Sequence, residues 1–127
     1  YPMKIEVSIG EVVDKYTILT IKKLLIHDTE KLINIDKEWK VVKNALHRKH
    51  SVILIDPLVQ ELYSINKKLW AVEDHLREHE HKKDFGETFV ELAREVYQLN
   101  DVRAIMKKQI NAKYGSELTE EKSYKEY

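Results

Sequence analysis

The chain has 127 residues, enough for one domain with a sizeable core and too few for two. Its 22 lysines and arginines equal its 22 aspartates and glutamates, so it lacks the basic excess that general nucleic-acid binding requires. It contains no cysteine, which excludes disulfides, thiolate metal sites and thiol catalysis. With neither an apolar run near the roughly 20 residues of a membrane helix nor a signal-peptide pattern, we expect a soluble cytoplasmic protein.

The first predicted elements are a short extended segment and a helix. Residues 3–7 alternate apolar and polar side chains, the period of a strand or extended arm, whereas residues 1–2 look like a remnant outside the native chain. Ser8 and Glu11 have the spacing of a capping box, which predicts a helix from there to about residue 27. Apolar side chains surround most of this helix, so it should be buried on several sides.

Two further helices are marked by their N-caps. Asp28 begins a helix whose apolar stripe reaches Leu46. Asp56 and Pro57 supply an N-cap and an N1 proline for a third helix, after the short apolar segment 52–55. The third helix has a heptad-like series of apolar side chains, formed by Leu58, Leu62, Ile65, Leu69, Val72 and Leu76.

A fourth helix completes the predicted fold. It follows a break at residues 82–86 and runs to about Lys113, with Gly115 in the left-handed position after its last turn and a polar tail over residues 116–127. Four amphipathic helices with short connections predict an all-α fold, an antiparallel helical bundle with a short N-terminal extended segment, in one domain over residues 3–127. Because the first helix is too apolar for three neighbours to cover, we expect a homo-oligomer, a dimer in the simplest case.

A charged side chain interrupts the apolar face of the fourth helix. The face consists of Phe89, Leu92, Val96, Leu99, Arg103, Met106 and Ile110. A guanidinium cannot lose its charge, so Arg103 must reach water or meet an anion. Asp14 on the first helix and Glu73 on the third are placed to converge on it if the three helices pack together.

Two interpretations of this cluster stay open. It is either a structural ion network that fixes the register of the helices, or a site where Arg103 and Lys107 hold a small anion such as phosphate or carboxylate. The candidate ligand-binding residues are Asp14, Lys15, Glu73, Asp74, Asn100, Asp101, Arg103 and Lys107.

Two functions from different classes follow from these residues. The first is a non-enzymatic oligomeric binding module that presents the cluster to a partner protein or a small anionic ligand. The second is an enzyme acting on a phosphorylated or nucleotide-sugar substrate, with Glu73 or Asp74 as general base and the two cations holding charge. We favour the binding module, since the sequence has no glycine-rich phosphate loop and no nucleophile motif.

His75 and His79 are the candidates for a metal site. They stand four residues apart on one helix face, a workable pair of ligands. No matching Glu-x-x-His pair occurs elsewhere, and cationic side chains also suit the end of a helix. We therefore expect a solvated helix end, with no metal and no other cofactor.

Several segments together resemble a known family. Residues 8–15, 69–74, 84–86, 96–103 and 120–124 are similar to the signature blocks of an uncharacterised microbial family of short helical proteins, a domain of unknown function. The resemblance covers nearly the whole chain and implies no activity, substrate or cofactor. The signature blocks include most of the candidate ligand-binding residues, namely Asp14, Lys15, Glu73, Asp74, Asn100, Asp101 and Arg103. The resemblance also implies that the tail at residues 120–124 is a docked segment.

Overall fold

The structure, a computed structural model, describes residues 3–115 and residue 126. In this part of the chain it contains no strand and four α-helices: α1 (Ile9–Leu25), α2 (Thr29–Lys49), α3 (Pro57–Lys82) and α4 (Glu87–Tyr114), with a 3-10 helix η1 (Ile53–Ile55) before α3. The predicted all-α bundle is therefore confirmed. None of the described helices combines the length and the apolar character needed to cross a membrane. The expectation of a docked tail at residues 120–124 lies outside the described residues.

The helices begin and end at the local signals in the sequence. Ser8, Asp28 and Asp56 each accept a hydrogen bond from a backbone amide in the first turn of α1, α2 and α3, at 3.1, 3.0 and 2.8 Å. Such a bond satisfies one of the amides that a helix start leaves without a partner. Lys83, with a φ of 55°, and Gly115, with a φ of 69°, end α3 and α4 in the left-handed conformation.

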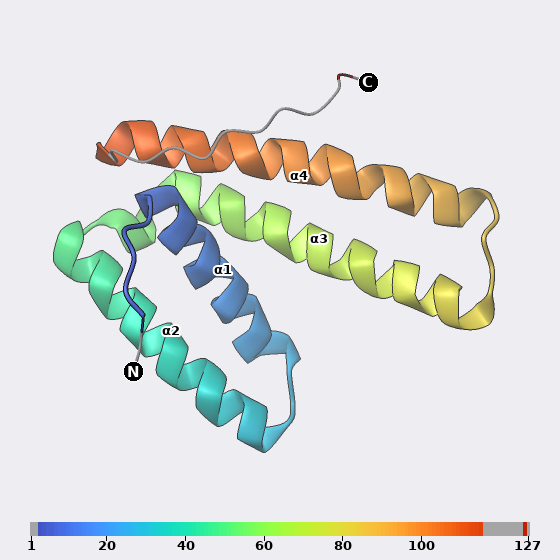
Figure 1. Ribbon diagram of the computed structural model, residues 1–127, viewed down its shortest axis with the longest axis horizontal. Coiled ribbons are helices and arrows are strands. Elements are labelled where there is room, and N and C mark those ends of the chain that lie inside the picture. The colour runs from blue at the N-terminus through green and yellow to red at the C-terminus, as the bar shows by residue number, and fades with distance from the viewer. Residues whose placement is uncertain (1–2, 116–125, 127) are drawn as a thin grey trace.

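Helix α1 is the central element of the fold. It contacts α2, α3 and α4, whereas α2 contacts only α1 and η1 among the described elements. Figure 1 shows two antiparallel hairpins, α1–α2 and α3–α4, with the longer α3–α4 hairpin extending well past α1. Residues 3–7 form an extended segment that runs back from the start of α1 toward α2. We call this segment the N-terminal arm.

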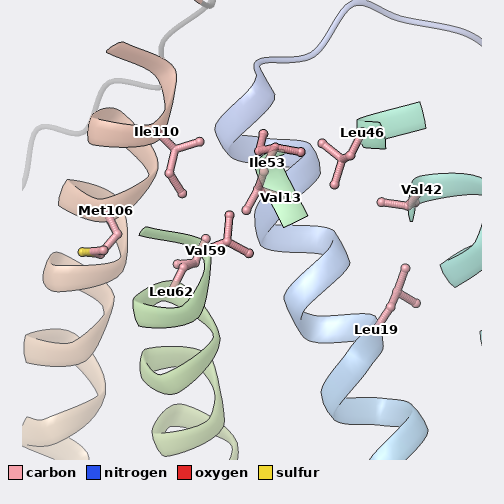
Figure 2. Close-up of a cluster of buried hydrophobic side chains, with 9 residues drawn as sticks. All are labelled: Val13, Leu19, Val42, Leu46, Ile53, Val59, Leu62, Met106 and Ile110. Carbon is pink, nitrogen blue, oxygen red and sulfur yellow. The ribbon is translucent and has the colours of Figure 1, made fainter. Parts of the chain in front are cut away.

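The core lies where α1 crosses the other elements. Its buried side chains, drawn in Figure 2, are Val13, Leu19, Val42, Leu46, Ile53, Val59, Leu62, Met106 and Ile110. They come from all four helices and from η1, so one core joins both hairpins. This central position explains why the apolar side chains of α1 are spread around so much of its circumference.

Candidate functional site

The carboxylate of Asp14 joins three helices. It lies on the buried side of α1, only 3% exposed. Arg103 of α4 donates two hydrogen bonds to it, from Nε to Oδ1 at 2.8 Å and from Nη2 to Oδ2. Asn66 of α3 donates from Nδ2 to Asp14 Oδ1 at 2.9 Å and to the Thr17 hydroxyl at 2.8 Å. A bidentate guanidinium and an amide thus hold a charge that would otherwise be costly to bury.

A second polar contact fixes the start of α1 against α4. The Gly10 amide donates to Asn111 Oδ1 at 2.6 Å, which satisfies a free amide of the first turn. An added Cβ at Gly10 would lie 2.6 Å from the Lys107 carbonyl oxygen, so the two helices approach more closely here than any other residue would allow. Lys107 Nζ lies 2.7 Å from the Glu11 carboxylate. The predicted capping box therefore forms only in part, because Glu11 binds Lys107 rather than the Ser8 amide.

An open groove borders this network on the side of α1 that faces the N-terminal arm. It has a volume of about 620 Å³. Its apolar walls include Ile5 and Val7 of the arm and Val12, Ile18 and Leu19 of α1. Its charged lining consists of Glu11, Asp14, Lys15, Lys22, Glu38 and Arg103. The side chain of Arg103 is 27% exposed, so the guanidinium reaches the groove while it binds Asp14.

Each carboxylate in the lining of the groove has a cation beside it. Asp14 binds Arg103 and Glu11 binds Lys107, and Glu38 lies 3.8 Å from Lys15. The third contact is long and joins two exposed side chains, so it contributes little. Lys22 is different, because no carboxylate in residues 3–115 or at residue 126 lies within ion-pair distance of its ammonium group. Among the cations of the groove lining, Lys22 is therefore the one without a carboxylate beside it in the described part of the chain.

The structure brings together some of the predicted site residues and separates others. Asp14 and Arg103 are in direct contact, and Asn100 accepts a long hydrogen bond of 3.4 Å from Arg103 Nη1. Glu73 and Asp74 are exposed on the part of α3 beyond Asn66 and do not line the groove. Of the other candidates, Lys107 and Lys15 form the ion pairs described above. Asp101 is half-buried on α4, and His75 is exposed on α3.

The remaining histidine candidate, His79, lies in the last turn of α3 and contacts the turn that leads to α4. Its Nδ1 lies 3.1 Å from the carbonyl oxygen of Asp84, and its ring packs near Phe89. Among the described residues, no group of three or more histidine, aspartate or glutamate side chains is arranged to hold a metal ion.

Two asparagines that hold the network together were not among the predicted site residues. Asn66 shares the buried face of α3 with Leu62 and Leu69 and stands next to Ile65 of the predicted apolar series, and Asn111 follows the buried Ile110 on α4. Both are less than 7% exposed. The signal for each was weaker than for Arg103, because each asparagine stands beside a position of a predicted apolar stripe, Ile65 or Ile110, and not within the stripe.

A separate buried cluster joins the start of α3 to the end of α4. Asp56 accepts hydrogen bonds from the Leu58 amide and the Tyr114 hydroxyl, and it lies 2.6 Å from Lys113 Nζ. Burial favours the neutral acid, but the bonds from Lys113, Tyr114 and Leu58 outweigh it and hold the pKa of Asp56 below its ordinary value. Burial, with the carboxylate beside it, raises the pKa of Tyr114 to about 12. The ring of His50 packs on Tyr114 with centroids 4.8 Å apart. This cluster ties two chain segments together and lies outside the groove.

Comparison with known proteins identifies a family without a known activity. No curated protein and no solved structure matches the chain. A family model does match it over residues 3–127, which confirms the resemblance seen in the signature blocks. The chain therefore belongs to the family of unknown function DUF6165.

Proposed function

We propose that this protein is an oligomeric helical binding module, without catalytic activity, whose groove binds a small ligand with one anionic group and an apolar body. The observation that carries the proposal is the Lys22 ammonium group, which lies in the lining of the groove without a carboxylate partner among the described residues. The charges of Asp14 and Glu11 are neutralised by Arg103 and Lys107, so they do not repel an anion that approaches Lys22.

The dimensions and lining of the groove favour a small ligand over a broad protein surface. Ligand sites are commonly concave, about 300–1,000 Å³ in volume, and mostly apolar with a few charged or polar groups. The groove has about 620 Å³ and apolar walls on both sides, from the arm and from α1. An apolar chain would be buried between Ile5, Ile18 and Leu19, while its anionic end contacts Lys22 and Lys15. A partner protein remains the second form of the same proposal, and the experiment below separates the two.

Arg103 has a positioning role in this proposal. By binding Asp14 it fixes α1 against α4, and α1 supplies most of the residues that line the groove. An enzyme acting on a phosphorylated or nucleotide-sugar substrate would need a carboxylate free to act as a base within reach of the cations. Glu73 and Asp74 do not line the groove, and Asp14 is occupied by Arg103 and Asn66. The arrangement therefore supports binding better than catalysis.

Calorimetric titration with three probes tests the proposal. Octyl phosphate should bind, while octanol and inorganic phosphate, which carry only the apolar part or only the charge, should bind much more weakly. Lys22→Gln should weaken octyl phosphate binding by up to about fivefold, the equivalent of one exposed ion pair. Lys37→Gln is the matched control, because Lys37 is an exposed lysine of α2 outside the groove.

Two outcomes would contradict the proposal. Equal binding of octyl phosphate and inorganic phosphate would show that the apolar walls are not used. No heat of binding with any probe, at concentrations up to the solubility of octyl phosphate, would exclude a small amphipathic anion and favour the partner protein. The oligomeric state and the cytoplasmic location belong to the same proposal and stay predictions.

A further inference from the structure

The N-terminal arm is a segment whose backbone makes no hydrogen bond to the described part of the chain. Residues 3–7 precede α1 as a segment without helix or strand, and none of them makes a hydrogen bond or ion pair with residues 3–115 or 126. Unpaired amides and carbonyls along an extended chain are a template for pairing with a second strand. The arm therefore offers the hydrogen-bonding edge of a strand without the strand that would complete it.

The side chains of the arm are divided between two faces. In an extended chain alternate residues point to opposite sides, so Met3, Ile5 and Val7 share one face and Lys4 and Glu6 share the other. Ile5 and Val7 line the groove, yet they remain 74% and 48% exposed, and Met3 is 89% exposed. The apolar face of the arm thus lies toward α1 but is only partly covered by it.

The sequence of the arm is complementary to itself in the antiparallel direction. If Ile5 lies opposite Ile5 of the partner subunit, Lys4 lies opposite Glu6 of the partner subunit, and Glu6 lies opposite Lys4 of the partner subunit. A two-fold axis through Ile5 creates both ion pairs at once, as an isologous interface requires. On the other face, the apolar side chains of both arms gather into one continuous layer.

From these observations we propose that two copies of the chain dimerise by antiparallel pairing of their N-terminal arms, centred on Ile5. A two-stranded ribbon of this length is marginal by itself, so packing against a helix is needed for stability. Here Ile5 and Val7 of each arm already line one wall of the groove beside α1, so each copy supports its half of the ribbon through that wall. This inference supplies the interface of the oligomer in the proposed function and rests on that part of it, but it does not depend on the anionic ligand.

Charge exchange within the arm tests the pairing. In Lys4→Glu both charged positions of the arm are acidic, and in Glu6→Lys both are basic, so each variant opposes like charges in its own dimer. Each should raise the dissociation constant of the homodimer by about tenfold or more, because two attractive pairs become repulsive. The double variant Lys4→Glu/Glu6→Lys again has opposite charges at positions 4 and 6 and should dimerise as tightly as the unmodified protein. An equimolar mixture of the two single variants should form a heterodimer.

Sedimentation equilibrium of the full chain over a range of concentrations measures all of these states. Circular dichroism checks that each variant keeps its helices, which we expect because Lys4 and Glu6 are exposed and make no hydrogen bond or ion pair with the described residues. Lys37→Glu, with the same charge change on α2, is the control and should leave the dimer unchanged. The proposal is overturned if the original chain stays monomeric throughout, if both single variants dimerise as tightly as it does, or if the mixture forms no heterodimer. None of these results depends on ligand binding, so they leave the calorimetric test of the groove independent.

Discussion

The contact between Asp14 and Arg103 makes the sharpest prediction about stability. Asp14 is 3% exposed, and its two carboxylate oxygens both accept hydrogen bonds from Arg103. Arg103→Leu removes those donors and leaves a buried carboxylate whose remaining side-chain donor among the described residues is Asn66. Removing one partner of a buried pair typically costs about 3–5 kcal/mol. We expect about 3 kcal/mol, the lower end, because the Arg103 side chain is 27% exposed and the vacated space can admit water.

A double-mutant cycle separates the pair from its surroundings. Asp14→Leu should destabilise the protein less than Arg103→Leu, since a partly exposed guanidinium can turn toward water. The double variant Asp14→Leu/Arg103→Leu buries no unpaired charge, so its loss should be smaller than the sum of the single losses by at least about 1 kcal/mol. Urea unfolding followed by circular dichroism measures each free energy of unfolding. Additive losses, or an Arg103→Leu variant as stable as the original, would refute the assignment of this contact as a coupled buried ion pair.

Two other features of the structure give predictions of their own. Gly10→Ala places a Cβ 2.6 Å from the Lys107 carbonyl oxygen and should destabilise the protein by about 1–3 kcal/mol, whereas Gly86→Ala, with its nearest neighbour at 3.4 Å, should leave the urea midpoint nearly unchanged. Because the pKa of Asp56 is lowered in the folded state, its carboxylate stabilises the protein at pH values above the ordinary value of 3.8, and this contribution is lost as the pH falls through the lowered pKa. The free energy of unfolding of Asp56→Asn, measured by urea titration below pH 4, should therefore depend less on pH than that of the unmodified protein. Because the pKa of Tyr114 is raised to about 12 in the folded state, its protonated hydroxyl stabilises the protein fully below pH 10 and progressively less toward pH 12. Tyr114→Phe should therefore lack this decrease in the free energy of unfolding at alkaline pH.

Most of the fold could be predicted because its signals are local. Ser8, Asp28 and Asp56 mark helix starts through bonds to amides only two or three residues away, and Gly115 marks an end through its own backbone conformation. Such features depend little on the rest of the molecule. The crossing of α1 over α4 was different, because it depends on the absence of a side chain at Gly10 and on an acceptor more than a hundred residues away, Asn111.

The candidate site could be predicted only where a charged side chain on an apolar helix face needed a side chain of opposite charge beside it. Arg103 in an apolar stripe required an anion, and Asp14 on the apolar face of another helix supplied one. Glu73 did not join them, because α1 meets α3 around Asn66 and Glu73 lies two helical turns farther along, about 10 Å at 1.5 Å per residue. Periodicity shows which residues share a face of a helix, but the length over which that face is covered by a neighbour is set by the tertiary packing.

An ion pair of Arg103 with Asp14 and an effect of Arg103 on the proposed ligand site are compatible, although the anion is then held by Lys22 and Lys15 and not by Arg103 and Lys107. Helix α1 carries Asp14, which binds Asn66 and Arg103, and it also carries Val12, Ile18 and Lys22, which line the groove. A rotation of α1 that separates Asp14 from Arg103 must also turn the groove residues, because one rigid helix carries both sets. Arg103→Lys keeps a positive charge but loses the bidentate geometry, so it should preserve much of the stability while α1 is held less precisely. Weaker octyl phosphate binding in this variant, with helix content unchanged, would show that the ion pair acts on the ligand through the position of α1.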